Sequence, residues 1–190
     1  IGDAGAYPTI GAFLVFFTRQ MAPGVYDIPK VDVKIVGVAT NTTPVAAYRG
    51  AGRPEATQFL ERALDIAADE LGIDPVEIRK RNFIDSWPYQ TPVALQYDVG
   101  DYLGCMNKAQ ELAEVAGFEQ RKASSAAKGL LRGIGYSSYI EACGLAPSNI
   151  AGALGARAGL FEAGEVRVHP TGTVTVFTGS HSHGQGHETT

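Results

Sequence analysis

The sequence is poor in the residues that build covalent or metal frameworks. Only two cysteines, Cys105 and Cys143, stand among its 190 residues, together with two methionines and one tryptophan. Two cysteines cannot supply the four thiolates of an ordinary iron–sulfur cluster, and they do not form the pattern of a secreted disulfide framework. We therefore expect a protein of the reducing cytoplasm.

Long apolar runs and runs of one charge are also missing. The apolar stretch 11–17 is far shorter than the roughly 18 residues of a membrane span, so it predicts a buried strand. The 16 basic and 20 acidic residues are scattered singly and leave a net charge of −4, which gives nucleic acid no basic face to bind. We expect neither a membrane span nor a nucleic-acid partner.

What remains is a globular composition. Hydrophobic residues make up 45% of the sequence and aromatic residues 9%, enough for the core of one large domain or of pieces of two. The sequence starts at Ile1 without an initiator methionine, and it stops at Thr190 in what resembles the opening of a helix. We interpret it as an excerpt from a longer polypeptide.

A glycine-bearing loop stands before the clearest helix, in the sequence Ala47-Tyr48-Arg49-Gly50-Ala51-Gly52-Arg53-Pro54-Glu55-Ala56. Pro54 suits the first helical position, where its missing N–H would have had no partner. The N–H groups of that turn and the two glycines predict a cradle for an anion or a metal-bound oxygen. A tight connection would show the same pattern, so the loop alone does not decide between binding and structure.

The helix after this loop has clear limits. Apolar residues recur with helical spacing from Pro54 to Leu71, and Gly72 suits the left-handed position beyond the last turn. Glu61 and Asp65 lie off the apolar stripe, so we expect them on the polar face.

Two further helices are predicted from their capping residues. Asp74 caps the first and Asp101 the second. Cys105 and Met106 lie on the apolar face of the second helix, and we interpret both as core residues rather than as metal or redox groups. The expected ends of these helices are Asn82 and Gly117.

Strand patterns fill most of the rest, and alternation predicts a β-hairpin around Pro170-Thr171-Gly172. The polar stretch 119–128 separates a helical from a strand-rich region, so we predict one domain over 1–122 and another over 123–190, with a mixed α+β fold. The Gly- and Ala-rich stretch 148–158 is a predicted loop. The predicted strands are 31–35, 93–99, 131–143, 165–168 and 173–177.

A second glycine loop follows the hairpin, at 178–190. It holds three of the four histidines, and a His-x-His pair can offer two nitrogens to zinc, although no cysteine pair stands nearby. Gly184-Gln185-Gly186 fits better as backbone donors for a phosphate or a pterin, with the Gln185 amide adding a donor and an acceptor.

Together these motifs resemble the molybdopterin-binding large subunit of the xanthine oxidase family, nearest its aerobic carbon monoxide dehydrogenase-like branch. The resemblance covers the whole chain and implies a segment that spans the end of the first and the beginning of the second molybdopterin-binding domain. The motifs that carry it are the first loop (47–56), Tyr139-Ile140-Glu141-Ala142-Cys143-Gly144, Gly184-Gln185-Gly186-His187-Glu188-Thr189-Thr190, Gly24-Val25-Tyr26-Asp27-Ile28-Pro29 and Asn41-Thr42.

The resemblance also implies the cofactor and the partners. Molybdenum held by a pterin, commonly the cytosine dinucleotide form in bacteria, would oxidise a small organic substrate with water as the oxygen source. Electrons would leave through an iron–sulfur small subunit to an FAD medium subunit, in a cytoplasmic dimer of heterotrimers. The implied cofactor-binding residues are Arg49, Gly50, Ala51, Gly52, Gly184, Gln185, Gly186 and His187.

Three departures from the family pattern bear on the substrate. Carbon monoxide dehydrogenases of this branch have a copper-binding cysteine where Gly50 stands. Purine-oxidising relatives have Phe at the position of Ala51 and Arg at that of Phe17. The missing residues disfavour carbon monoxide and purines and leave aldehydes or other small activated carbons as substrates.

The family's general base, a glutamate, would lie outside this sequence, so no catalytic residue is predicted within it. For Glu55, Glu141 and Glu188 we expect helix-start stabilisation or ordinary polar contacts. The alternative to the enzyme is a non-catalytic module that binds zinc or a phosphate metabolite.

Overall fold

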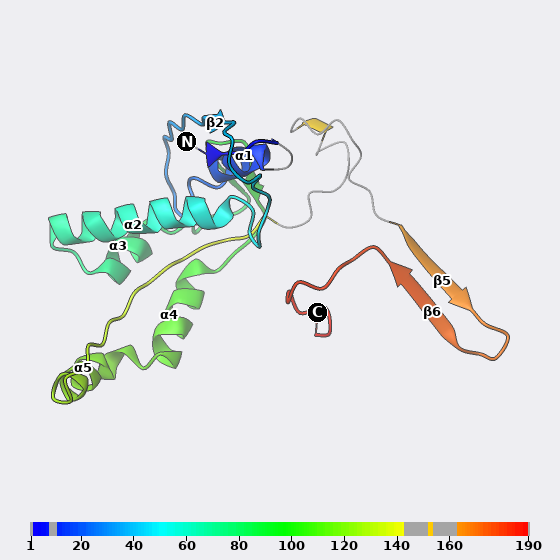
Figure 1. Cartoon of the computed structure of the whole chain (residues 1–190). Coiled ribbons are helices and arrows are strands. Elements are labelled where there is room, and N and C mark those ends of the chain that lie inside the picture. The colour runs from blue at the N-terminus through cyan, green and yellow to red at the C-terminus, as the bar shows by residue number, and fades with distance from the viewer. Residues whose placement is uncertain (1, 8–10, 143–151, 154–162, 190) are drawn as a thin grey trace. The chain divides into compact units, whose positions relative to one another are not determined.

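The computed structural model describes residues 2–7, 11–142, 152–153 and 163–189. The chain divides into two compact units, Ile1–Glu141 and Ala142–Thr190. The first unit combines helices with short strands, and the second contains a β-hairpin and a loop (Figure 1). This content confirms the α+β prediction. The predicted domains 1–122 and 123–190 stay a prediction, because compactness in space does not by itself locate a family domain.

The apolar stretch near the N-terminus is a helix, so the prediction of a strand over 11–17 was wrong. Helix α1 (Ala12–Gln20) carries the turn-to-turn bonds of a helix, such as Thr18 Oγ1 donating to the Leu14 carbonyl at 2.8 Å. A short apolar run fits a buried strand or a buried helix equally well. Packing against α2 (Arg53–Leu71) accompanies the helical form here.

The predicted strand over 31–35 was also wrong. The strand lies just beyond it, as β2 (Gly37–Val38), which pairs in parallel with β1 (Gly2–Asp3). Alternation of residues cannot show where a partner strand is; among the described residues, β1 pairs through Gly2 and Asp3.

Helices α2 and α3 (Pro75–Asn82) confirm their predicted limits. Gly72 ends α2 in the left-handed conformation, with φ of 63°. Asp74 caps α3 by accepting bonds from the N–H groups of Val76 and Glu77 at 2.8 and 3.0 Å. Capping signals of this kind are local in sequence, which is why they are readable without the fold.

The core of the first unit lies where the segment after α1 meets α3 and α4 (Tyr102–Leu112). Val25 and Tyr26 are almost completely buried, and the Tyr26 ring stacks on Phe83 with centroids 5.5 Å apart. The remaining buried members of this core are Val76 and Met106, and the residues packed against it are Ile28, Leu60, Leu64, Tyr102, Tyr136 and Ile140.

The α4 region differs from its prediction in two ways. Met106 is buried as predicted, but Cys105 is exposed, so the prediction of a core cysteine was wrong. The helix ends at Leu112 rather than at Gly117, and a 3₁₀ turn η1 (Val115–Gly117) leads into α5 (Phe118–Ala126). Glu114, with φ of 49°, separates α4 from η1.

Two strand predictions outside the hairpin were too long. The region 93–99 contributes only β4 (Gln96–Tyr97), which pairs with β3 (Tyr89–Gln90). No strand occurs in the part of 131–143 that the structure describes. Cys143 lies outside the described residues, as does most of the loop predicted over 148–158.

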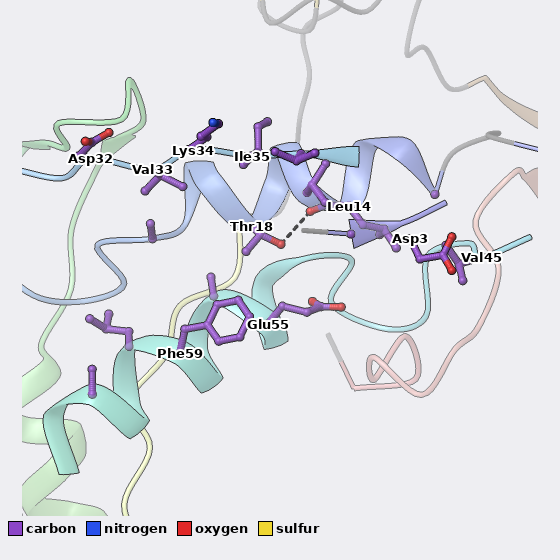
Figure 2. Close-up of a pocket in the computed structure, with 18 residues that line it drawn as sticks. Asp3, Leu14, Thr18, Asp32, Val33, Lys34, Ile35, Val45, Glu55 and Phe59 are labelled. Carbon is purple, nitrogen blue, oxygen red and sulfur yellow. Dashed lines mark hydrogen bonds between the residues drawn. The ribbon is translucent and has the colours of Figure 1, made fainter. Parts of the chain in front are cut away.

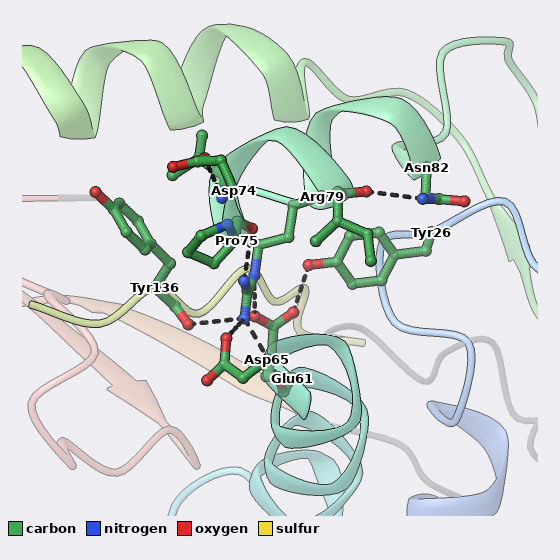
Figure 3. Close-up of polar contacts among 10 residues, drawn as sticks. Tyr26, Glu61, Asp65, Asp74, Pro75, Arg79, Asn82 and Tyr136 are labelled. Carbon is green, nitrogen blue, oxygen red and sulfur yellow. Dashed lines mark hydrogen bonds and ion pairs between the residues drawn. The ribbon is translucent and has the colours of Figure 1, made fainter. Parts of the chain in front are cut away.

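A buried ion cluster joins α2 to α3 around Arg79 (Figure 3). Arg79 is fully buried, and its guanidinium contacts Glu61 Oε2 and Asp65 Oδ1, both at 2.8 Å. It also donates to the carbonyls of Pro75 and Tyr136 at 2.7 and 3.2 Å. Burial lowers the pKa of Arg79, but its bonds to Asp65 and Glu61 outweigh this and raise the pKa overall.

Glu61 belongs to this cluster rather than to the solvated face of α2, so its predicted place was wrong. Its side chain is buried, and the Tyr26 hydroxyl donates to Oε1 at 2.5 Å. Burial and this bond raise the pKa of Tyr26 well above its usual value. A carboxylate can occupy such a place because a cation and a hydroxyl compensate its lost hydration.

The second unit contains the predicted hairpin. Strands β5 (Gly164–Val168) and β6 (Val174–Thr178) pair antiparallel, with Val166 opposite Val176. Gly172 in the turn has φ of 85°. Among the helices that the structure describes, none has the length and apolar character that crossing a bilayer requires.

Candidate cofactor-binding site

The first glycine loop is a tight, hydrogen-bonded turn. Ala51 N–H donates to the Tyr48 carbonyl at 3.0 Å, and Arg53 N–H donates to the Gly50 carbonyl at 3.1 Å. Gly50, Ala51 and Gly52 have φ of 96°, 41° and 86°, a run that glycine makes accessible. Within the described residues, the N–H groups of Gly50 and Gly52 donate no hydrogen bond. The loop thus presents the N–H groups of Gly50 and Gly52, and its binding of an anion or a metal-bound oxygen stays a prediction.

Gly52 holds this loop against α1. A Cβ on Gly52 would lie 2.4 Å from the Leu14 carbonyl oxygen and 2.8 Å from Thr18 N. Both are backbone atoms of a helix, so they cannot move aside as a side chain can. Only glycine fits between the loop and α1.

Arg53 is the residue of this loop that the sequence analysis missed. It is buried, its guanidinium lies 4.7 Å from the centroid of the Phe17 ring, and Nη1 donates to the Ala51 carbonyl at 3.1 Å. Arg53 Nε forms an ion pair with Glu141 Oε1 at 3.1 Å. The polar role expected for Glu141 is confirmed. No local pattern pointed to Arg53, since its partners come from α1 and from a segment far along the chain.

Arg49, the charged member of the predicted set, is exposed. It forms no ion pair with any residue in the described part of the chain. The Tyr48 side chain beside it is 84% exposed. A cation next to backbone donors can meet an anionic or oxo group from outside the loop.

A cavity of about 730 Å³ adjoins the loop. Its walls come from α1, the segment 32–36 and α2; Figure 2 shows Thr18 and Leu14 of α1 facing the side of α2 that carries Phe59. Leu14 and Thr18 line the cavity, and their backbone atoms are the ones that a Cβ on Gly52 would meet. Most lining side chains are apolar, and Asp3, Asp32, Lys34 and Glu55 are the charged ones. The cavity therefore suits an apolar organic group better than an anion.

The second glycine loop is held by the Gln185 side chain. Its Oε1 accepts from His183 N–H at 2.5 Å, and its Nε2 donates to the His181 carbonyl at 2.9 Å. Because these two partners fix which end of the amide is the nitrogen, His187 Nε2, 2.8 Å from Gln185 Nε2, is an acceptor. The Gln185 amide is thus engaged within the loop.

Backbone groups remain for a ligand at this loop. Gly184 and Gly186 have φ of 87° and 85°. Within the described residues, the N–H groups of Gly184 and Gln185 donate no hydrogen bond. Successive N–H groups in such a conformation suit phosphate oxygens.

The histidines of the loop contact one another and Gln185. The rings of His181 and His183 lie edge to face with centroids 4.6 Å apart, and His187 Nε2 is bonded to Gln185. No group of three or more His, Cys, Asp or Glu side chains that could hold a metal occurs within the described residues.

Comparison with known proteins identifies the family. Two family models, both described as molybdopterin cofactor-binding domain, match residues 1–83 and 108–190. The chain belongs to the molybdopterin cofactor-binding domain family. Each glycine loop lies within one of the two matched regions, Arg49–Gly52 in the first and Gly184–His187 in the second.

Similar curated proteins include large subunits of oxidoreductases. The carbon monoxide dehydrogenase large chain of Hydrogenophaga pseudoflava is 37% identical over 99% of this chain and 24% of its own length. The nicotine 6-hydroxylase large subunit of Paenarthrobacter nicotinovorans is 32% identical over 99% of this chain and 23% of its own length. The chain thus spans about a quarter of the relatives it matches.

A solved structure supports the same family. Quinoline 2-oxidoreductase from Pseudomonas putida 86 matches with a TM-score of 0.83 and 34% identity, over 98% of this chain and 24% of that chain. The family confirmed here is the one that the motifs of both loops indicate. The predicted binding roles of individual residues stay predictions.

Proposed function

We propose that this chain is part of the catalytic large subunit of a molybdenum hydroxylase. The observation that carries the proposal is a glycine loop in each matched molybdopterin-binding region. Among the described residues, the N–H groups of Gly50 and Gly52 in one loop, and of Gly184 and Gln185 in the other, donate no hydrogen bond. Such loops fit the oxygen-rich groups of a pterin nucleotide and of a molybdenum centre. When bound, the cofactor supplies the oxidation of the substrate with water as the oxygen source.

The two loops have different tasks in this proposal. Arg49 and the N–H groups of Gly50, Ala51 and Gly52 would hold oxygen atoms of the molybdenum cofactor by hydrogen bonds whose directions the loop sets before binding. Ala51 keeps its bond to Tyr48, so Gly50 and Gly52 are the principal donors.

The second loop is proposed to bind pterin and phosphate groups. Gly184, Gln185 and Gly186 provide backbone contacts to the pterin and its phosphates, and His187, as the partner of the Gln185 amide, keeps the loop in shape. We propose the cytosine dinucleotide form of the cofactor, the form common among bacterial members of the family that the sequence resembles.

The substrate in this proposal is an aldehyde or another small molecule with an activated carbon. Ala51 offers no aromatic face for a flat heterocycle. Phe17 stands where purine-oxidising relatives have an arginine, so it provides no positive charge, and its ring packs against the Arg53 guanidinium. The adjoining apolar cavity suits an organic substrate.

Electron transfer and location complete the proposal. The substrate's electrons pass to iron–sulfur clusters on a small subunit and then to FAD on a medium subunit, in a cytoplasmic dimer of heterotrimers. The relatives named as large chain and large subunit support a multi-subunit assembly.

Cofactor analysis of the full-length subunit, purified with its partners, tests the proposal. We expect molybdenum near one atom per subunit and a pterin nucleotide released by denaturation. Reduction of an artificial electron acceptor should follow the addition of an aldehyde. Zinc or a phosphate metabolite in place of molybdenum and pterin would instead support the non-catalytic alternative.

The enzyme is expected not to oxidise carbon monoxide, because Gly50 offers no sulfur and soft Cu(I) prefers a thiolate. A Gly50→Cys change alone should not confer this activity. A Cβ on Gly50 would lie 2.6 Å from Pro54 Cγ, and the φ of 96° strains any other residue. Copper content and carbon monoxide turnover of both forms are the measurements. Copper bound next to molybdenum in either form would contradict this prediction.

Gly186→Val is expected to lower pterin content about tenfold or more. The branched side chain would block one backbone contact to phosphate, and the loss of that contact weakens binding by about 1.4 kcal/mol or more. Gly172→Val is the matched control, because Gly172 has the same φ of 85° and nothing near its Cβ position. Pterin released per folded subunit is the measurement for both variants. Equal loss in both would attribute the effect to backbone strain rather than to the cofactor contact.

A further inference from the structure

Arg53 connects three parts of the first unit at the candidate loop. Its guanidinium covers the Phe17 ring of α1, donates to the Ala51 carbonyl, and pairs with Glu141. Its own N–H donates to the Gly50 carbonyl. Arg53 therefore bonds to Ala51 through its side chain and to Gly50 through its backbone.

The Glu141 end of this connection is itself anchored. Arg79 donates to the Tyr136 carbonyl, and Ile140 packs against the core. The residues just before Glu141 are thus held to the core of the first unit, and this places the Glu141 side chain next to Arg53. Glu141 is about half exposed, whereas Arg53 is buried.

We infer that Arg53 is a positioning residue for the cofactor loop and that Glu141 orients Arg53. The inference rests on the proposed function, because it assigns the pair to the presentation of the Gly50 and Gly52 N–H groups. The planar guanidinium is required, since one face covers Phe17 while separate nitrogens serve Ala51 and Glu141. An ammonium keeps the charge but cannot make these contacts in one geometry.

The test uses Arg53→Lys, Glu141→Gln and the double variant in the full-length subunit within its complex. Arg81→Lys is the matched control, because Arg81 also pairs with a glutamate, Glu77 at 2.7 Å, but on the exposed face of α3. We measure the rate of molybdenum and pterin loss on dilution, the Mo(V) electron paramagnetic resonance spectrum, and thermal unfolding of the cofactor-free subunit.

We expect Arg53→Lys to lose cofactor at least about tenfold faster than wild type, a difference of about 1.4 kcal/mol in the barrier to loss. Its Mo(V) spectrum should shift, because the loop's N–H groups would no longer be held in place beside the molybdenum. Glu141→Gln should act in the same direction, and the double variant should lose cofactor no faster than Arg53→Lys, since both changes break one connection.

Two results would overturn the inference. One is cofactor loss and a Mo(V) spectrum for Arg53→Lys like those of Arg81→Lys, because Arg53 would then not position the cofactor loop. Destabilisation of the cofactor-free subunit in the same variant would show that Arg53 acts on folding alone. The other is additive acceleration in the double variant, which would show that Glu141 does not act through Arg53. A wild-type complex without molybdenum or pterin would instead overturn the proposed function.

Discussion

Gly52→Ala is expected to destabilise the full-length subunit by about 3 kcal/mol or more and to release its cofactor. Two costs combine: a left-handed backbone in a residue with a Cβ costs about 1–2 kcal/mol, and overpacking costs about 1–3 kcal/mol. The second cost applies because the new methyl would meet the Leu14 oxygen at 2.4 Å. Thermal unfolding of the cofactor-free subunit and molybdenum content are the two measurements.

Gly72→Ala separates the two costs. Gly72 lies at the other end of the same helix with φ of 63°, and nothing lies within 4 Å of its Cβ position. It should therefore show only the backbone cost, about 1–2 kcal/mol, and keep its molybdenum. Equal effects of the two changes on unfolding and on molybdenum would show that the loop is not held against α1 as described.

Arg79→Met is expected to destabilise the first unit by about 3–5 kcal/mol, because removal of one partner leaves a buried carboxylate uncompensated. That carboxylate is Glu61, which is 5% exposed; among the described residues, the Tyr26 hydroxyl would be its remaining side-chain donor. Thermal unfolding of the full-length subunit and the protease sensitivity of the region around α2 and α3 are the measurements.

Arg81→Met provides the control for this change. It lies two residues further along α3, and its ion pair with Glu77 is exposed, so the loss should be at most about 1 kcal/mol. Adding Glu61→Gln to Arg79→Met should restore part of the stability, because an amide needs less compensation than a buried charge. A double variant less stable than Arg79→Met alone would contradict the assignment of the loss to the charge on Glu61.

Local signals in the sequence were sufficient for features that depend on neighbouring residues. Asp74, Asp101 and Gly72 mark helix ends because a cap and its partners lie within a few positions of one another. The hairpin around Gly172 is local in the same way. The glycine loops were recognisable for this reason too, since residues close in sequence set the direction of their N–H groups.

Features that depend on distant partners were missed. The stretch predicted as a strand over 11–17 is part of helix α1, which packs against α2. Glu61 is buried because Arg79, from α3, pairs with it. Cys105 is exposed although it lies on the same apolar face of α4 as Met106. Periodicity shows which face of a helix is apolar, but not how much of that face the neighbouring elements cover.

The sequence by itself determined the family, the two glycine loops and the capped helices, because each is specified by residues close together in the chain. Only the tertiary structure decided the surroundings of the first loop. Phe17, Arg53 and Glu141 are separated by 36 and 88 positions along the chain, and folding brings their side chains into contact. No spacing or composition encodes such a contact, since it depends on how α1, α2 and the segment before Glu141 pack together.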